Sequence, residues 1–154
     1  MALKLLIVLN LFVYSVIVGQ SFMYIIALRN VQESMGAASY IELRKLLDRN
    51  FLKKFKPVVY SALLLGLALV TVSLFQSSLV LTAGSIIAFA GLLIDVVLIL
   101  KGDMPINRII NSWTLETFPA NWVEYRSKWL YWFSWRQAAN ISGFIALIIA
   151  AVFQ

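Results

Sequence analysis

Residues 57–100 read PVVYSALLLGLALVTVSLFQSSLVLTAGSIIAFAGLLIDVVLIL, and this stretch decides the fold class. Its only charged residue is Asp95. A helix needs about 20 apolar residues to cross the hydrocarbon core of a bilayer, so the stretch is long enough for two spans. The Gln-Ser-Ser sequence at 76–78 interrupts the apolar run and predicts a short hairpin. The two spans are expected at about 57–75 and 79–100.

Two further apolar runs flank this stretch, at 5–28 and 137–153. The chain has 154 residues, of which 62% are hydrophobic, with 13 basic and 7 acidic residues. A soluble domain of this size cannot bury so much apolar surface. The first run is long and lacks an Ala-x-Ala-like exit, so we expect a span rather than a cleaved signal peptide. The prediction is one all-α integral membrane domain over 1–154, a bundle of four transmembrane helices.

The basic residues lie mainly in the two long loops between spans. Seven lie between the first and second spans, five lie between the third and fourth, and only Lys4 lies on the other side. By the positive-inside rule, both loops are cytoplasmic and both termini are outside. The net charge of +6 therefore indicates topology and contact with anionic lipid heads, not nucleic acid. We expect a multi-pass protein of the bacterial inner membrane.

The first long loop has a helical pattern after Gly36, which predicts a break in the chain. An apolar stripe flanked by basic residues then predicts an amphipathic helix at the cytoplasmic interface. Asn50 lies within a turn of this stripe and could face inwards, so it is a candidate binding residue. The stripe consists of Tyr40, Leu43, Leu47, Phe51 and Phe55.

The second long loop contains two predicted breaks. Pro105 closely follows Asp103, which predicts that a helix stops and restarts there with Asp103 as its N-cap. Pro119 marks the second break, and Asn121 is placed to cap the helix that follows it.

Polar and small residues within the first three spans fall on single helical faces. The polar face of the first span should point at other helices. It either forms hydrogen bonds between helices or lines a pocket. The small faces of the second and third spans allow helix backbones to approach closely. These faces are Asn10, Tyr14, Ser21 and Tyr24; Ala62, Gly66 and Ser73; and Gly84, Ala88 and Gly91.

Asp95 continues the small face of the third span and is the only ionisable residue embedded in it. An acid at such a position costs about 3 kcal/mol on insertion scales and indicates a function unless a partner explains it. Two interpretations stay open. Asp95 is either a functional acid or one half of a salt bridge to Arg108, Arg126 or Arg136.

All five tryptophans fall between residues 103 and 140. From Trp122 onwards, one helical face alternates aromatic rings with cations and ends in an amide. For Trp132 and Trp135 we favour interfacial anchoring, whereas Arg126 and Arg136 lie on the inward stripe and favour a site. The alternating face comprises Trp122, Arg126, Trp129, Phe133, Arg136 and Asn140.

The chain contains no cysteine and no histidine. It therefore lacks the ligands of zinc, haem and copper sites and the bases of Ser-His-Asp and Cys-His systems. We predict no cofactor and no metal.

Four short motifs, in this order and spacing, resemble the anthrone-oxygenase-like family of small four-span membrane proteins. They are Gly-x-x-Phe at 19–22, Arg-x-x-Leu-Asp-x-Asn at 44–50, Pro-x-Asn at 105–107, and the set Trp122, Trp129 and Arg136. The resemblance implies a four-helix bundle and, for members tied to chemistry, cofactor-free oxygenation of aromatic anthrones. It would place a flat substrate among Asn107, Trp113, Trp129 and Arg136. A histidine expected in some relatives before the last arginine is absent from the local Phe-Ser-Trp-Arg sequence at 133–136.

Three functions remain open at this point. The first is an enzyme or binding protein for a lipophilic aromatic or quinone-like molecule, with a pocket near the cytoplasmic interface. The second is a non-catalytic membrane scaffold or subunit, in a homo-oligomer or larger complex, and the third is a small transporter. For the first, the candidate catalytic residues are Asp95, as base, and Arg136, and the candidate substrate-binding residues are Asn50, Asn107, Trp113, Arg126 and Trp129.

Overall fold

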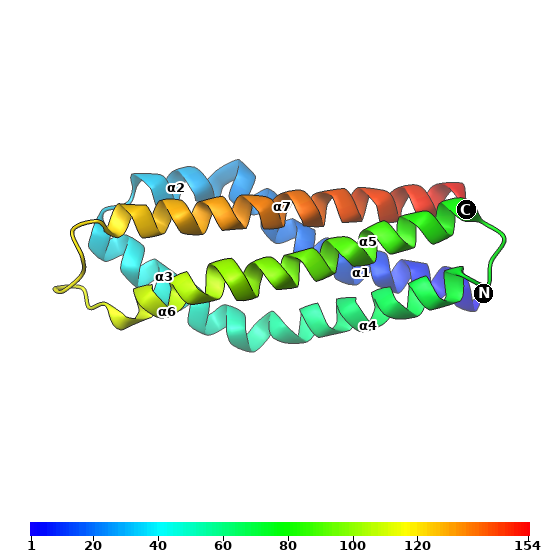
Figure 1. Cartoon of the computed structure of the whole chain (residues 1–154), viewed down its shortest axis with the longest axis horizontal. Coiled ribbons are helices and arrows are strands. Elements are labelled where there is room, and N and C mark those ends of the chain that lie inside the picture. Colours follow the sequence, from blue (N-terminus) through cyan, green and yellow to red (C-terminus); the bar gives the residue numbers. More distant parts are fainter.

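A computed structural model describes residues 1–154, apart from the side chain of Leu52. Nearly all of the described residues lie in helices that run along one long axis (Figure 1). Four helical stretches are long and apolar enough to cross a membrane, which confirms an all-α chain with four candidate spans. They are Ala2–Ser34, Lys56–Ser73, Leu79–Ser112 and Trp122–Phe153.

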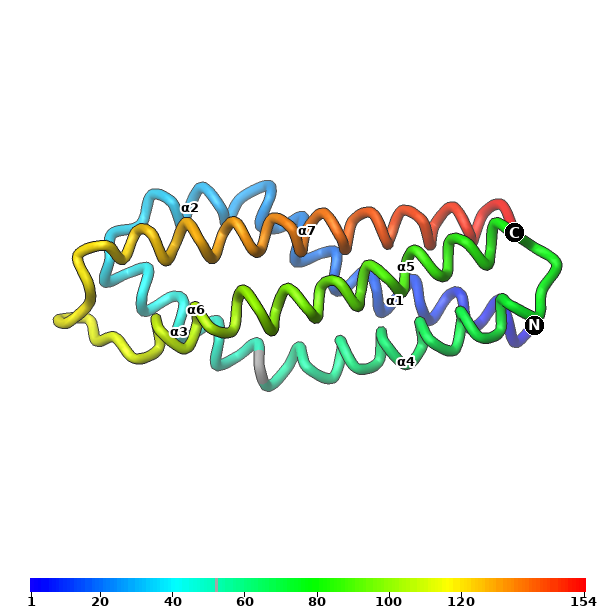
Figure 2. Tube along the Cα trace, in the orientation of Figure 1, coloured from blue at the N-terminus to red at the C-terminus, as the bar shows by residue number. Residues whose placement is uncertain are grey.

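The first stretch joins three helical segments without a break. Helix α1 (Ala2–Met23) passes through a π-helical turn, η1 (Tyr24–Leu28), into α2 (Arg29–Ser34). The chain then becomes extended at Met35 and Gly36, which confirms the predicted break. Helix α3 (Ala37–Lys54) runs back along the molecule and leads into α4 (Lys56–Ser73), as the tube in Figure 2 shows.

The predicted hairpin between the second and third spans is confirmed. It joins α4 to α5 (Leu79–Leu98), and the Ser78 hydroxyl caps α5 by accepting a hydrogen bond from the Leu81 N–H at 3.2 Å. Pro57 lies in the first turn of α4, where its missing N–H costs nothing.

The predicted helix stop at Asp103 is wrong. Helix α5 continues through a π-helical turn, η2 (Ile99–Asp103), into α6 (Met104–Ser112). Pro105 falls in the first turn of α6, directly after the widened turn, so its missing N–H does not end the helix. Asp103 makes no capping bond, because its carboxylate binds Arg136 instead.

The last helix, α7 (Trp122–Phe153), has 32 residues and is therefore about 48 Å long. This exceeds the roughly 30 Å of a bilayer's hydrocarbon core. Asn121 occupies the N-cap position as predicted, but its side chain binds the Glu124 carboxylate rather than a backbone N–H.

The molecule has two halves along its axis. In the first half, α1, α4, α5 and the end of α7 lie together, and both termini and the α4–α5 hairpin lie at its tip (Figure 1). In the second half, α2, α3 and α6 surround the start of α7. Each half has its own core of buried residues, built around Ile17 and Leu147 in the first and around Trp129 and Ile110 in the second.

The most extensive helix contact in the first half joins α5 and α7. A Cβ on Gly84 would lie 2.6 Å from the Ala150 Cβ, and one on Gly91 would lie 2.8 Å from the Ala139 carbonyl oxygen. The predicted small-residue packing is therefore present. The polar face of α1 also points inwards, and Tyr14 donates a hydrogen bond to the Ala88 carbonyl at 3.3 Å.

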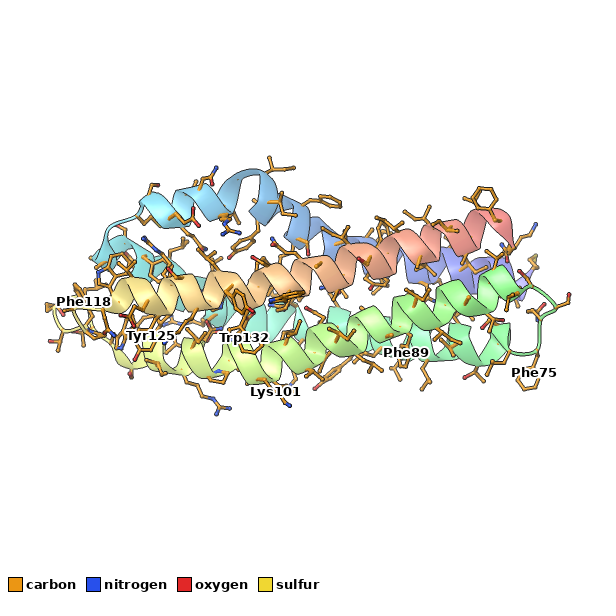
Figure 3. The ribbon with its side chains drawn as sticks, turned by 45° about the horizontal axis from the view of Figure 1, so that its top comes forward. Phe75, Phe89, Lys101, Phe118, Tyr125 and Trp132 are labelled. Atoms are coloured by element: carbon orange, nitrogen blue, oxygen red, sulfur yellow. The ribbon has the colours of Figure 1, made fainter. Side chains whose placement is uncertain are left out.

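Large apolar side chains cover the outside of the first half. Phe75 is 84% exposed at the hairpin, and the view with side chains shows it at the tip and Phe89 along the surface (Figure 3). Such a surface fits lipid contact, since monomeric soluble proteins rarely expose continuous apolar patches of this extent.

Candidate functional site

A buried group of three charges lies where the two halves meet. The Arg136 Nε donates to Asp95 at 2.7 Å, and its Nη1 donates to Asp103 at 2.5 Å. These residues come from α7, α5 and η2, and their exposed fractions are 7%, 1% and 3%. Of the three arginines considered from the sequence as partners of Asp95, Arg136 is therefore the one that binds it.

A second buried arginine balances the charge of this group. Arg44 in α3 is 4% exposed and lies close enough to Asp103 to act on it electrostatically. Two carboxylates and two guanidinium groups thus share one buried region. Balance of this kind is required, because an unpaired charge in a protein interior is costly.

Arg44 also connects this region to the surface through Asn107. Its Nη2 donates to the Asn107 Oδ1 at 2.7 Å, and the Asn107 amide donates to Asp48 at 2.9 Å. Asn111 donates to the other oxygen of Asp48 at 2.7 Å. Asn107 thus joins Arg44 to Asp48, whereas Arg44 acts on Asp103 only electrostatically.

The aromatic part of the site surrounds Trp129. The Arg44 guanidinium carbon lies 3.8 Å from the centre of the Trp129 ring, and Phe133 stacks on the same ring at 4.9 Å and 12°. Tyr24 packs against both rings, at 5.6 Å from Trp129 and 4.4 Å from Phe133. A planar molecule that stacks on Trp129 would have to displace Arg44 or Phe133.

Trp113 lies in the same core but has other neighbours. It is 8% exposed and meets Tyr125 edge-on, with ring centres 5.2 Å apart. Its carbonyl accepts a hydrogen bond from the Lys45 ammonium group. These contacts hold the loop after α6 against α3 and α7.

Arg126 binds backbone rather than Asp95. Its Nη1 donates to the carbonyls of Gln32 and Met35 at 3.0 and 3.1 Å, at the end of α2. Its guanidinium also lies 4.8 Å from the centre of the Trp122 ring, which confirms the alternation of rings and cations on α7. Arg126 therefore satisfies a helix C-terminus and joins α2 to α7.

Asn50 lies outside the cluster. Its side chain is exposed and donates to the Leu46 carbonyl of its own helix at 2.9 Å, so the expectation that it faces inwards is wrong. The inward face of α3 passes through Tyr40, Arg44 and Asp48 instead. A spacing of four residues places these three on one face, and this signal could have found them in the sequence.

Several buried polar atoms in this region have no hydrogen-bond partner among the described residues. Arg44 lies on the Trp129 ring and Tyr40 belongs to the same core, whereas buried polar groups in proteins are nearly always paired. They are the Gln32 Oε1, Tyr40 Oη, Arg44 Nε, Asp103 Oδ1, Trp129 Nε1 and Asn140 Oδ1 atoms.

Tyr40 lies in α3, outside the candidate spans. Burial raises the pKa of Tyr40 to about 12, although the positive charge of nearby Arg44 acts in the opposite direction. The hydroxyl is therefore neutral at physiological pH and can donate a hydrogen bond.

Two cavities lie near this region, but neither is lined by Asp95, Arg136 or Trp129. One of about 240 Å³ is lined by Lys45, Asp48, Arg49 and Asn111. The other, of about 340 Å³, lies between α5 and α7 on the outer surface. The pocket expected from the sequence therefore does not coincide with either.

Comparisons with known proteins give no relative. No protein-family model, curated protein or solved structure matches the chain. The chemistry of the site must therefore be argued from its geometry.

The donors and acceptors of this site suit hydrogen bonding to an uncharged polar group. Arg44 Nε and Trp129 Nε1 are donors, and Asp103 Oδ1 is an acceptor. No group of three or more potential metal ligands from His, Cys, Asp and Glu occurs among the described residues.

Proposed function

We propose that this chain is an integral membrane protein that crosses the bilayer four times, with both termini outside. The apolar surface of the first half and the 18-residue length of α4, about 27 Å, support insertion of that half. The second half, with α2, α3 and α6, then extends into the cytoplasmic interface. The concentration of basic residues in the two long loops supports this orientation.

We further propose that the second half binds a lipophilic aromatic molecule through a hydroxyl group, such as a hydroquinone or phenol. The observation that carries this proposal is the set of unpaired atoms around Trp129. A hydroxyl oxygen can accept from the Arg44 and Trp129 N–H groups, and its proton can be donated to Asp103 Oδ1. Apolar rings of Tyr24 and Phe133 beside these atoms suit an aromatic body.

Asp103 takes the role that Asp95 had in the sequence hypothesis. Asp95 and Asp103 each bind the Arg136 guanidinium through one oxygen, and the other oxygen of Asp103 is buried without a partner among the described residues. In this proposal Arg136 is a positioning residue that holds both carboxylates, and Asp103 contacts the ligand.

The resemblance to anthrone oxygenases supports an aromatic ligand. It gives less support to an oxidation reaction. Transfer of oxygen without a cofactor needs a group that removes a proton from the substrate. Histidine is the usual group near neutral pH, and this chain has none. We therefore propose binding of the aromatic molecule and not its oxidation.

The test is binding of a naphthohydroquinone to the purified protein in detergent, followed by quenching of tryptophan fluorescence. We expect binding of the hydroquinone and a loss of about ten-fold in affinity for its dimethyl ether, which corresponds to one hydrogen bond to a charged group. Asp103→Asn should remove this preference, while Glu124→Gln at the exposed start of α7 should not. Equal affinity for hydroquinone and ether in the native protein would contradict the proposal.

Pairing within the cluster favours a second candidate function. Arg136 and Asp95 are mutually satisfied, and Arg126, Lys45 and Arg44 each join two segments. In this alternative the chain is a non-catalytic scaffold or subunit, and the cluster only holds the cytoplasmic half together. It predicts that Asp103→Asn lowers stability, that no hydroquinone binds, and that the chain copurifies with a larger complex.

A further inference from the structure

A groove lies between α5 and α7 on the outside of the half that carries the apolar surface. It is shallow and open to the outside, with a volume of about 340 Å³. All but one of the residues that line it are apolar. They are Ile94 and Leu98 from α5, and Trp135, Ala138, Ala139 and Ser142 from α7.

The groove runs parallel to the helix axes. Ile94 and Leu98 are four residues apart on one face of α5, and the lining residues of α7 lie three or four residues from Trp135 or from Ser142, which places them on one face of that helix. An apolar groove in this direction suits an extended hydrocarbon chain, because lipid chains lie along the membrane normal. It does not suit a flat ring system.

Two cations lie beyond the end of the groove that is nearer the second half. Lys101 lies in the π-helical turn that follows Leu98, and Lys128 precedes Trp135 by seven residues, so it lies on the same face of α7 as Trp135. Both side chains are exposed. Trp132 packs on Gly102, the residue next to Lys101, and Figure 3 labels both Lys101 and Trp132.

The acid nearest to this end in sequence does not oppose these cations. Asp103 is buried, and its carboxylate binds Arg136. Glu124 is exposed one turn before Lys128, where its carboxylate accepts from the Asn121 amide, so the two lysines leave one net positive charge at this end of the groove, next to the exposed ring of Trp135. This combination matches a hydrocarbon chain attached to an anionic head.

We propose that the groove binds one acyl chain of an anionic phospholipid of the cytoplasmic leaflet, with the lipid phosphate between Lys101 and Lys128. The proposal rests on the membrane insertion and orientation proposed above, and it is independent of the hydroquinone site around Trp129. The chain contacts apolar side chains, and the two ammonium groups select the negative head.

Native mass spectrometry of the purified protein tests the proposal. The protein is equilibrated with equal amounts of phosphatidylglycerol and phosphatidylcholine that carry the same acyl chains. We expect one phosphatidylglycerol retained per chain in preference to phosphatidylcholine. Ala138→Leu fills the groove without entering the core, because Ala138 is exposed, and should reduce retention about ten-fold through the loss of contact with roughly two methylene groups.

Matched variants distinguish loss of lipid binding in the groove from a general effect of the substitutions on the protein. Ala83→Leu places the same side chain on an exposed part of α5 near the hairpin and should leave retention unchanged. Lys101→Gln with Lys128→Gln should abolish the preference for phosphatidylglycerol, whereas Lys4→Gln at the other end of the molecule should not. Equal retention in the Ala138 and Ala83 variants would overturn the proposal, as would an unaltered preference in the double lysine variant.

Two other outcomes would also overturn it. A dimer that Ala138→Leu dissociates would show that a second copy of the chain occupies the groove. Retention of a single hydroquinone-like molecule that depends on Ala138 would place the aromatic ligand there. Asp103→Asn is measured in parallel, so failure of the hydroquinone site and failure of the lipid groove give different results.

Discussion

Arg136 is the residue on which the buried charges depend. Its guanidinium binds both Asp95 and Asp103, and all three side chains are withdrawn from solvent. Removing one partner of a buried ion pair leaves an uncompensated charge, whereas losing a surface charge has little effect. Here the removal of one cation would leave two carboxylates in the interior.

Arg136→Gln should therefore lower the free energy of unfolding by about 3–5 kcal/mol. The measurement is denaturant unfolding in mixed micelles, followed by tryptophan fluorescence. Arg108→Gln is the matched control, because Arg108 is exposed on α6, and it should change the stability by less than about 0.5 kcal/mol. Equal effects of the two variants would mean that the carboxylates are neutral or hydrated in the native protein.

Tyr40 permits a prediction on pH. Its pKa is raised from 10.0 to about 12, so between these pH values the unfolded chain ionises while the native protein stays neutral. The native protein therefore loses stability relative to the unfolded state as the pH rises from 10 towards 12. Tyr40→Phe should make this loss smaller. At pH 7 the variant should be about as stable as the native protein, since the buried hydroxyl has no hydrogen-bond partner to lose.

Thermal unfolding of both proteins between pH 7 and pH 11.5 checks this expectation. Tyr60→Phe serves as the control, because Tyr60 is 55% exposed and should leave the slope unchanged. A parallel decline of the Tyr40 variant and the native protein would contradict it.

The sequence predicted part of the group of buried charges. The helical period placed Asp95 on an inward face and Arg136 on another, and their pairing was one of three alternatives. Arg44 and Asp103 were missed for separate reasons. Arg44 lies in a basic segment where a topology signal explains each charge, and Asp103 precedes a proline that favours a capping role.

Among the elements, α5 and α7 depend on glycine for their close contact. A Cβ at Gly84 would meet the Ala150 Cβ at 2.6 Å and the Ala146 carbonyl oxygen at 2.8 Å. The latter atom belongs to backbone, so the helices must move apart to admit a methyl group.

Gly84→Ala should lower the free energy of unfolding by about 1–3 kcal/mol. Gly19→Ala is the control, since nothing lies within 4 Å of the added Cβ in α1. There the change should be neutral or stabilising by up to about 1 kcal/mol, because alanine favours the helix over glycine. Unfolding in mixed micelles compares the two, and a tolerated Gly84→Ala would mean that α5 and α7 are packed less closely.

The four apolar stretches could be predicted because they depend only on composition and length. The continuation of α5 into α6 was not, because it depends on a π-helical turn. Such a turn has no sequence signature of its own, and Asp103 with Pro105 is typical of a helix boundary.

For the whole molecule, the orientation in the bilayer is a prediction that labelling can test. The chain contains no cysteine, so single cysteines can be introduced without a background. Ser77→Cys in the α4–α5 hairpin and Ser127→Cys on α7 both replace exposed serines at opposite ends. In intact cells a membrane-impermeant maleimide should modify only the first.

After the cells are permeabilised, both positions should react. Modification of Ser127→Cys alone in intact cells would reverse the orientation. Modification of both in intact cells would mean that the chain does not cross the bilayer at all.

The tie between Asp95 and Arg136 joins positions 41 residues apart in the chain, and the tie between Asp103 and Arg136 joins positions 33 apart. During synthesis the third apolar segment, with Asp95 and Asp103, therefore leaves the ribosome well before Arg136, whose guanidinium binds both carboxylates. An isolated acid in a span costs about 2.5–3.5 kcal/mol on insertion scales. We therefore expect the third segment to stay in contact with the insertion machinery until the fourth segment has been synthesised. It would then enter the lipid together with the fourth segment.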